Sequence, residues 1–162
     1  MKIILTTDHA GFEQIQKIKA FLTELGHECL DFGPKELDQD DDYPDLIYPA
    51  ARALANGEAE MGIIMGGSGQ GEAIVANRVK GVRCAVYYGA AEAQEAIDAD
   101  GSSSADKYDI VRLSRQHNNA NMLSLGARFL SDNEIETVVS LWLATPYEGV
   151  ERHQRRINKI DA

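Results

Sequence analysis

Short apolar runs that alternate with helix-like stretches constrain the fold of this chain more than any other feature of its sequence. The apolar runs predict buried strands over residues 2–7, 28–32, 61–65, 83–88 and 122–127. The stretches between them repeat apolar residues at helical spacing, and they predict helices over residues 11–25, 45–56, 71–79, 90–99, 109–118 and 132–145. This alternation predicts an α/β fold, a three-layer sandwich in which a five-stranded parallel, Rossmann-like sheet has helices on both faces.

Composition and charge narrow the class of protein. A length of 162 residues suits one domain spanning residues 1–162, and the net charge of −10 argues against binding to nucleic acid. No run approaches the roughly 20 apolar residues that span a bilayer. The first residues are not expected to form a signal peptide, because their apolar stretch is short and no small-residue cleavage site follows it. Cys29 and Cys84 sit in apolar, strand-like runs and are expected to be small buried hydrophobes. We therefore expect a cytoplasmic, enzyme-sized domain with no membrane or nucleic-acid partner.

Polar residues that follow three of the predicted strands form the candidate site. Asp8 and His9 follow the first strand, the segment from Gly66 to Glu72 follows the third, and Arg128 follows the fifth. Ligands of parallel α/β sheets bind at the carboxyl ends of the strands. The sequence therefore predicts that these residues gather at one edge of the sheet.

The segment GGSGQGE, residues 66–72, is similar to a phosphate-binding loop until its last residue. A P-loop needs lysine where Glu72 stands, and a dinucleotide-binding fingerprint needs its third glycine there, so both nucleotide interpretations fail at the same residue. Two interpretations of Glu72 remain. It is a general base beside an oxyanion hole made by the amides of the glycine loop, or it is a first-turn glutamate that complements the helix dipole.

Basic residues cluster at the end of this otherwise acidic chain. Arg152 and Arg156 are four residues apart, on one face of a predicted helix, and two guanidinium groups so placed suit a phosphate. The alternative is a solvated charged helix that pairs with Glu148 and Glu151. Because the tail has few apolar positions, we expect it to reach a partner subunit rather than to pack on its own domain.

A histidine marks the end of the helix predicted before the fifth strand. His117 is followed by Asn118, and its ordinary pKa suits an acid or base near neutral pH. The alternative is a histidine that only favours the negative end of the helix dipole.

Two segments are predicted to be irregular. Residues 98–109 are rich in serine and glycine and have the character of an inserted flexible segment. The acidic segment 33–45 is either a solvated loop or a metal site, because it crowds four aspartates, Asp38, Asp40, Asp41 and Asp42. Its residues lack the ligand spacing of a known metal-binding loop, which favours the solvated loop.

Six short motifs, taken together, resemble one family of enzymes, the type B ribose-5-phosphate isomerases and the related galactose-6-phosphate isomerase subunits. The resemblance covers nearly the whole chain. It implies a homodimer or tetramer with active sites at the subunit interface, no metal or organic cofactor, and aldose–ketose isomerisation through an enediol. The motifs are DHAG (8–11), DDDYPD, GGSGQGEAIVANRV (66–79), RQHNNAN (115–121), LGARF (125–129) and RHQRR (152–156).

The resemblance also implies roles for individual residues. Asp8 handles hydroxyl protons of the sugar, His9 lies near its phosphate, and Tyr43 borders the sugar pocket. Ser68 bonds the reacting oxygens, and His117, with Asn118 beside it, assists opening of the furanose ring. The anion hole is implied at Gly67, Gly69 and Gly71, and the phosphate-binding arginines at Arg128, Arg152 and Arg156, some of them from the partner subunit.

The chain departs from the family pattern in two places. Many members carry a cysteine base just before the glycine loop, where this chain has Gly66, and a second branch has a glutamate at the position of Glu72 instead. This chain resembles the second branch, which implies that Glu72 is the base. The stretch between the fourth strand and RQHNNAN is longer than in most members. Its length is expected to alter the depth of the pocket, and therefore the length of sugar that the site accepts.

The expected function is interconversion of ribose 5-phosphate and ribulose 5-phosphate, a step of the pentose phosphate pathway, with a phosphorylated sugar as the substrate. A close alternative is the same chemistry on a hexose 6-phosphate such as galactose or allose 6-phosphate. A protein of a different class, which binds sugar phosphates without catalysis, is a further alternative. The presence of both Ser68 and Glu72 argues against this alternative.

Overall fold

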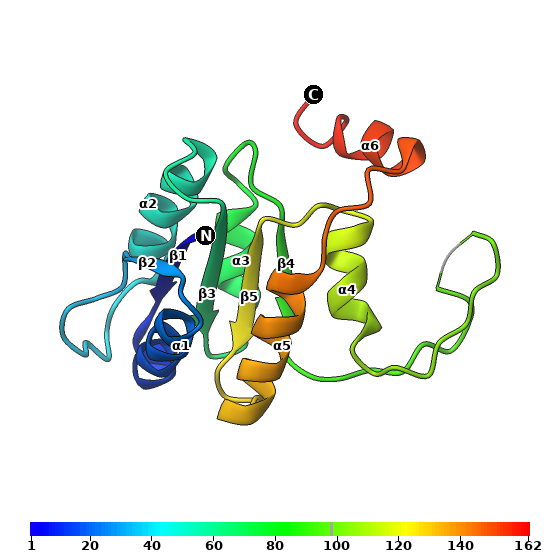
Figure 1. Cartoon of the computed structure of the whole chain (residues 1–162). Helices are drawn as coiled ribbons and strands as arrows, with labels where there is room; N and C mark the ends of the chain where they lie inside the picture. Colours follow the sequence, from blue (N-terminus) through cyan, green and yellow to red (C-terminus); the bar gives the residue numbers. More distant parts are fainter. Residues whose placement is uncertain (98) are drawn as a thin grey trace.

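The computed structural model describes residues 1–97 and 99–162, and its strands form a single parallel sheet (Figure 1). The sheet has five strands in the order β2-β1-β3-β5-β4. All five predicted strands are confirmed to within one residue at each end, as β1 (Lys2–Thr7), β2 (Glu28–Asp31), β3 (Met61–Gly66), β4 (Cys84–Tyr87) and β5 (Met122–Gly126).

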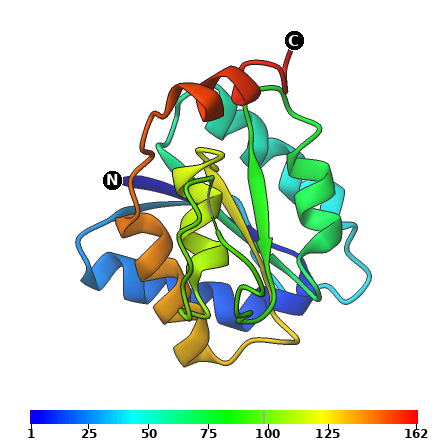
Figure 2. The same cartoon turned by 90° about the vertical axis from the view of Figure 1, so that its right-hand side faces the viewer.

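Helices cover both faces of the sheet, as the sequence predicts. In Figure 2, α1 and α5 lie on one side of the sheet and α2 and α3 on the other. Val111 places α4 in the same core as α1 and α5. The helices are η1 (His9–Gly11), α1 (Phe12–Glu24), α2 (Tyr43–Ala55), α3 (Gln70–Ala76), α4 (Asp109–Gln116), α5 (Asp132–Ala144) and α6 (Glu151–Ile157).

Alternate residues of the central strands feed two separate cores, because successive side chains of a strand point to opposite faces. Leu5 pairs in register with Ile63, which pairs with Leu123, and all three pack in the core beneath α1 and α5. Ile4 and Ile64 point the other way, into the core beneath α2 and α3. Burial on both faces explains why the strands are continuous apolar runs in the sequence.

The prediction of a helix over residues 90–99 is wrong for residues 90–97. Residues 90–97 contain no helix in the structure, and Asp98 lies outside the described residues. The segment is rich in alanine and glutamate, which favour helices, but residues 90–96 are all exposed. A helix this short is marginal in water unless one face packs on the core, and this segment has no such face.

The parallel topology gives the sheet two chemically different edges. Each helix that follows a strand starts at the carboxyl ends of the strands, the carboxyl edge, and runs back toward their amino ends, the amino edge. β1 and β3 are neighbours although β2 lies between them in the chain, so the topological switch point lies between them. Figure 1 shows α6 beyond the amino edge, on the opposite side from the arrowheads of the strands.

No helix within residues 1–97 and 99–162 combines the length and the apolar character needed to cross a membrane.

Candidate active site

Two buried carboxylates lie at the carboxyl edge, on either side of the switch point, and they interact electrostatically. Asp8 directly follows β1, and Glu72 lies in the first turn of α3, just after β3. Only 6% of Asp8 and 4% of Glu72 are exposed. Buried acidic side chains are rare unless something compensates them, so this pair distinguishes the site from an ordinary helix terminus.

The glycine loop between β3 and α3 is tied to β5 through its carbonyl groups. The carbonyls of Gly66 and Gly67 accept hydrogen bonds from the amides of Ala127 and Arg128 at 2.9 and 3.1 Å, respectively. In a trans peptide the next amide points away from the carbonyl, so the N–H groups of Gly67 and Ser68 point away from β5. The loop therefore presents amide donors on the side opposite to β5, as an anion hole requires.

Gly69 makes the sharp turn into α3. Its φ of 75° lies in the left-handed region that favours glycine, and its carbonyl accepts a 2.6 Å hydrogen bond from Ser124 Oγ. A β-carbon at this position would lie 3.0 Å from the backbone of Leu125. The turn thus brings the start of α3 against β5 and fixes the direction of Glu72.

The side chain of Glu72 turns back over the glycine loop rather than out to solvent. A β-carbon built on Gly66 would lie 2.0 Å from Glu72 Cδ, so the carboxylate occupies the space above that glycine. Burial raises the pKa of Glu72 above its ordinary value, and the neighbouring charge of Asp8 raises it further. A glutamate that merely complements the helix dipole needs neither burial nor this direction.

Asp8 shares the electrostatic environment of Glu72. Burial raises the pKa of Asp8 above its ordinary value, whereas the 2.9 Å hydrogen bond from the amide of Ala10 and the charges of His9 and Arg128 oppose that increase. Two acids with raised pKa values at one site are suited to proton transfer near neutral pH.

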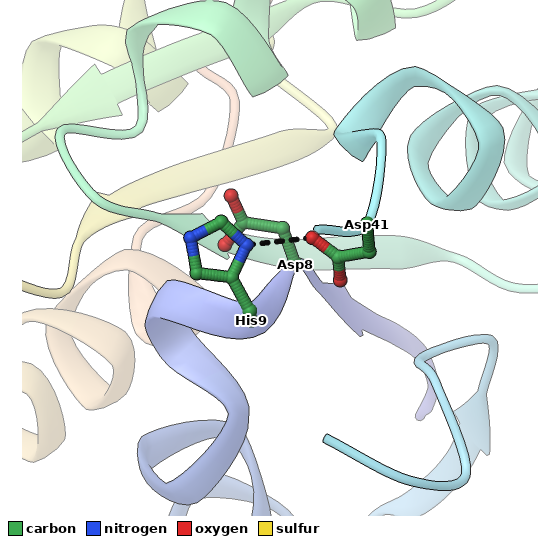
Figure 3. A group of neighbouring side chains, drawn as sticks. All are labelled: Asp8, His9 and Asp41. Atoms are coloured by element: carbon green, nitrogen blue, oxygen red, sulfur yellow. Dashed lines mark hydrogen bonds and ion pairs between the residues drawn. The ribbon is translucent and has the colours of Figure 1, made fainter. Parts of the chain in front are cut away.

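His9 is bonded to an acidic residue that the sequence did not single out as functional. Its Nδ1 lies 2.6 Å from Asp41 Oδ1, which comes from the loop before α2 (Figure 3). The hydrogen bond to Asp41 raises the pKa of His9 above its ordinary value. The expectation of a solvated loop is therefore wrong for Asp41, whose side chain is only 10% exposed, while Asp38, Asp40 and Asp42 are exposed.

Asp8, His9 and Asp41 also bring donor atoms within 4.8 Å of one another, which is close enough for a cation. The short bond between His9 and Asp41 already engages one donor atom of each residue.

Tyr43 and Arg128 lie against the glycine loop, at Gly71 and Gly67, respectively. A β-carbon on Gly71 would lie 3.0 Å from Tyr43 Cζ, and one on Gly67 would lie 3.3 Å from Arg128 Cζ. Both side chains are exposed, so they frame a surface open to solvent. The guanidinium of Arg128 is thus available to an anionic ligand at the carboxyl edge.

The remaining predicted site residues lie at the other edge of the sheet. His117 and Asn118 follow α4, which runs back from the carboxyl edge. Arg83, the residue before β4, donates from its Nε to the carbonyl of Asn118 at 3.1 Å, which places Asn118 at the amino end of that strand. Arg152 and Arg156 belong to α6, beyond the amino edge. Within one chain, these residues are separated from Glu72 by the length of the strands.

The amino-edge group is held together by a histidine that the sequence analysis did not single out. His153 is buried, and its ring stacks on His117 with a centroid separation of 4.2 Å. Arg152 Nε donates to His153 Nε2 at 3.1 Å. Burial lowers the pKa of His153, and the nearby His117, Arg152 and Arg156 lower it further. The RHQRR motif contained this residue, but only the stacking reveals its partner.

The structure therefore divides the predicted site into two halves. The carboxyl edge holds Asp8, His9, Tyr43, the glycine loop with Ser68, Glu72 and Arg128. The amino edge holds His117, Asn118, Arg152 and Arg156.

Comparison with known proteins places this arrangement in a family. The sequence profile described as Ribose/Galactose Isomerase matches residues 3–103 and 102–160. The chain belongs to the ribose/galactose isomerase family. Among curated members of this family, Ribose-5-phosphate isomerase B of Mycolicibacterium paratuberculosis is 38% identical over 158 residues, which are 98% of this chain and 88% of the relative. Ribose-5-phosphate isomerase B of Escherichia coli is 35% identical over 161 residues, which cover 99% of this chain and 95% of that one.

Solved structures of family members share the whole fold. Ribose-5-phosphate isomerase B of Clostridium thermocellum superposes with a TM-score of 0.84 at 34% identity, covering 99% of this chain and 95% of that one. The enzyme of Mycoplasma genitalium, solved with bound ribulose-5-phosphate, superposes with a TM-score of 0.82 at 34% identity, covering 98% and 93%. Similarity at this coverage shows that this ribose/galactose isomerase shares the sheet and helices of these structures.

Proposed function

We propose that this protein interconverts ribose 5-phosphate and ribulose 5-phosphate, with Glu72 as the general base. The observation that carries the proposal is the buried carboxylate of Glu72, which turns back over the glycine loop and lies near Asp8. The family relationship supports the same reaction, because relatives across several bacteria are named Ribose-5-phosphate isomerase B.

The proposed chemistry starts from the open-chain aldose. Glu72 removes the proton from C2, the C–H electrons form the C1–C2 double bond, and the carbonyl electrons move onto O1. The amides of the glycine loop and the Ser68 hydroxyl stabilise the resulting enediolate; one well-placed donor of this kind contributes about 3–4 kcal/mol. Asp8 moves a proton from O2 to O1, and Glu72 returns its proton to C1, which leaves the ketose.

The proposed active site needs two chains. His117 and Asn118, which open the furanose ring, and Arg152 and Arg156, which bind the phosphate, lie at the amino edge of their own sheet. In a homodimer that places the amino edge of one chain against the carboxyl edge of the other, both halves meet. Arg128 would then share the phosphate with the partner's basic helix.

The experiment that tests the function is a panel of pentose and hexose phosphates, assayed for aldose–ketose exchange in buffer with and without EDTA. We expect turnover of ribose 5-phosphate, together with exchange of the C2 hydrogen for solvent deuterium. Turnover of only allose or galactose 6-phosphate would assign the site to hexoses. Binding without any turnover or deuterium exchange would identify a sugar-phosphate-binding protein and refute the isomerase.

A further inference from the structure

One aspartate of the acidic loop is built into the carboxyl edge, unlike its neighbours. Asp41 has a side chain that is only 10% exposed, whereas the adjacent Asp40 and Asp42 are exposed. Its Oδ1 lies 2.6 Å from Nδ1 of His9, a residue 32 positions earlier in the chain. Burying a carboxylate is costly unless a partner compensates it, and this contact offsets part of the cost of turning Asp41 inward.

The contact determines which atom of His9 can meet a ligand. Because Nδ1 is engaged by Asp41, the free nitrogen is Nε2, which lies on the far side of the ring from Asp41 (Figure 3). A carboxylate that holds one imidazole nitrogen fixes both the orientation of the ring and its protonation. In the protonated ring both nitrogens are donors, so Nε2 can donate only to an acceptor such as a phosphate oxygen.

The charged groups around His9 favour the protonated ring. Asp41 accepts a hydrogen bond from His9, and Asp8 is the residue before His9 in the chain. Both acids favour the protonated imidazole, whereas the positive charge of Arg128 disfavours it. Glu72 also interacts with His9 electrostatically. The hydrogen bond to Asp41 is the largest effect raising the pKa of His9, and Asp8 adds to it, while partial burial and Arg128 lower it.

We propose that Asp41 is a positioning residue that orients the imidazole of His9 and keeps it protonated, so that Nε2 donates to the phosphate of the sugar. The identity of the ligand rests on the proposed function; the coupling of Asp41 to His9 does not. His9 and Arg128 then form a pair of cations at the carboxyl edge. Of the aspartates in the acidic loop, only Asp41 is hydrogen-bonded to His9.

The first test measures the protonation of His9 directly, by NMR titration of the ring carbons. The chain has only four histidines, so a His9→Gln variant identifies the His9 signal. We expect a His9 pKa above 6.5 in the parent protein, and a decrease of about one unit or more in Asp41→Asn. Asp40→Asn, which removes the same charge one residue away, is the matched control and should leave the His9 pKa close to its parent value.

Two outcomes of this titration would overturn the proposal. One is an equal His9 pKa in the Asp41→Asn and Asp40→Asn variants. The other is a parent His9 pKa at or below 6.5, which decides the question even if the Asp41→Asn variant does not fold.

The second test separates binding from turnover. With ribose 5-phosphate at pH 8, Asp41→Asn should raise KM about tenfold and change kcat less than about twofold, since a phosphate is held equally in the ground and transition states. A lower kcat with unchanged KM would overturn the phosphate-binding role. If the parent protein does not turn over ribose 5-phosphate, the proposed function fails, but the titration still tests whether Asp41 controls His9.

Discussion

The carboxylate of Glu72 fills the space that a β-carbon on residue 66 would need, since the two would lie 2.0 Å apart. A side chain at residue 66 and an inward-facing acid at residue 72 therefore exclude each other. This relationship gives a physical reason for glycine at the position where the family resemblance implies a cysteine base in many other members. Gly66 leaves room for the acid that we propose as the base in place of a thiolate.

Replacing Gly66 by alanine should therefore remove activity without unfolding the protein. The new methyl group would displace the Glu72 carboxylate from its position over the loop, and we expect kcat to fall at least about 100-fold, the low end of what a general base contributes. The measurement is steady-state turnover of ribose 5-phosphate, with circular dichroism as the check on folding.

The matched control for this prediction is Gly89→Ala. Gly89 has open space around its would-be β-carbon, so the same chemical change should leave turnover unchanged. Equal activity of the Gly66→Ala variant and the control would show that Glu72 does not need the space above residue 66.

Removing the acid while keeping its shape tests its role as the base. Glu72→Gln should lower kcat at least about 100-fold and change KM little, because the proton is transferred only in the transition state. The C2 deuterium exchange should fall in parallel with turnover. A variant that keeps near-normal turnover would remove Glu72 from the mechanism.

Burial of Glu72 predicts how activity depends on pH. Since burial raises the pKa of Glu72, its ionised, basic form is lost as the pH falls through a value above the ordinary glutamate pKa of 4.5. The acid limb of the kcat profile should therefore lie above pH 4.5. Asp8 and Glu72 interact, so the limb reports an apparent pKa of the pair. The limb should disappear in the residual activity of Glu72→Gln.

The same burial predicts a cost in stability. A raised pKa means that the folded chain holds the proton of Glu72 more tightly than the unfolded chain. This contribution favours folding at pH values below the unfolded pKa and is lost as the pH rises through the folded pKa. Urea unfolding should therefore show Glu72→Gln to be more stable than the parent at pH 7, by on the order of 1 kcal/mol. The difference should shrink toward pH 4; an opposite trend would contradict the burial of a charged acid.

The division of the site between two edges predicts complementation between inactive variants. Glu72→Gln damages the carboxyl edge, and the double variant Arg152→Ala/Arg156→Ala damages the amino edge. In a mixed dimer one site carries both defects and the other carries neither. Refolding the two proteins together in equal amounts should restore about a quarter of the parent activity at low substrate concentration. Activity no greater than the mean of the separate variants would contradict a shared site.

The sequence by itself determined the fold class, the strands and the carboxyl-edge residues. Strands buried on both faces must be continuous apolar runs, and the direction of a parallel sheet places Asp8, Glu72 and Arg128 at one edge whatever the details of packing. Local preference was not sufficient for residues 90–97, where alanine and glutamate favour a helix but no apolar face reaches the core.

Only the tertiary structure decided how Glu72 faces, what Asp41 contacts and how the site is divided. An acidic residue in a first helical turn has the same sequence signature whether it points to solvent or over Gly66. The bond between His9 and Asp41 joins positions 32 residues apart, and the stacking of His117 on His153 joins two helices at the amino edge. Such contacts depend on the path of the whole chain, because side chains distant in sequence meet only after the sheet and its helices have packed.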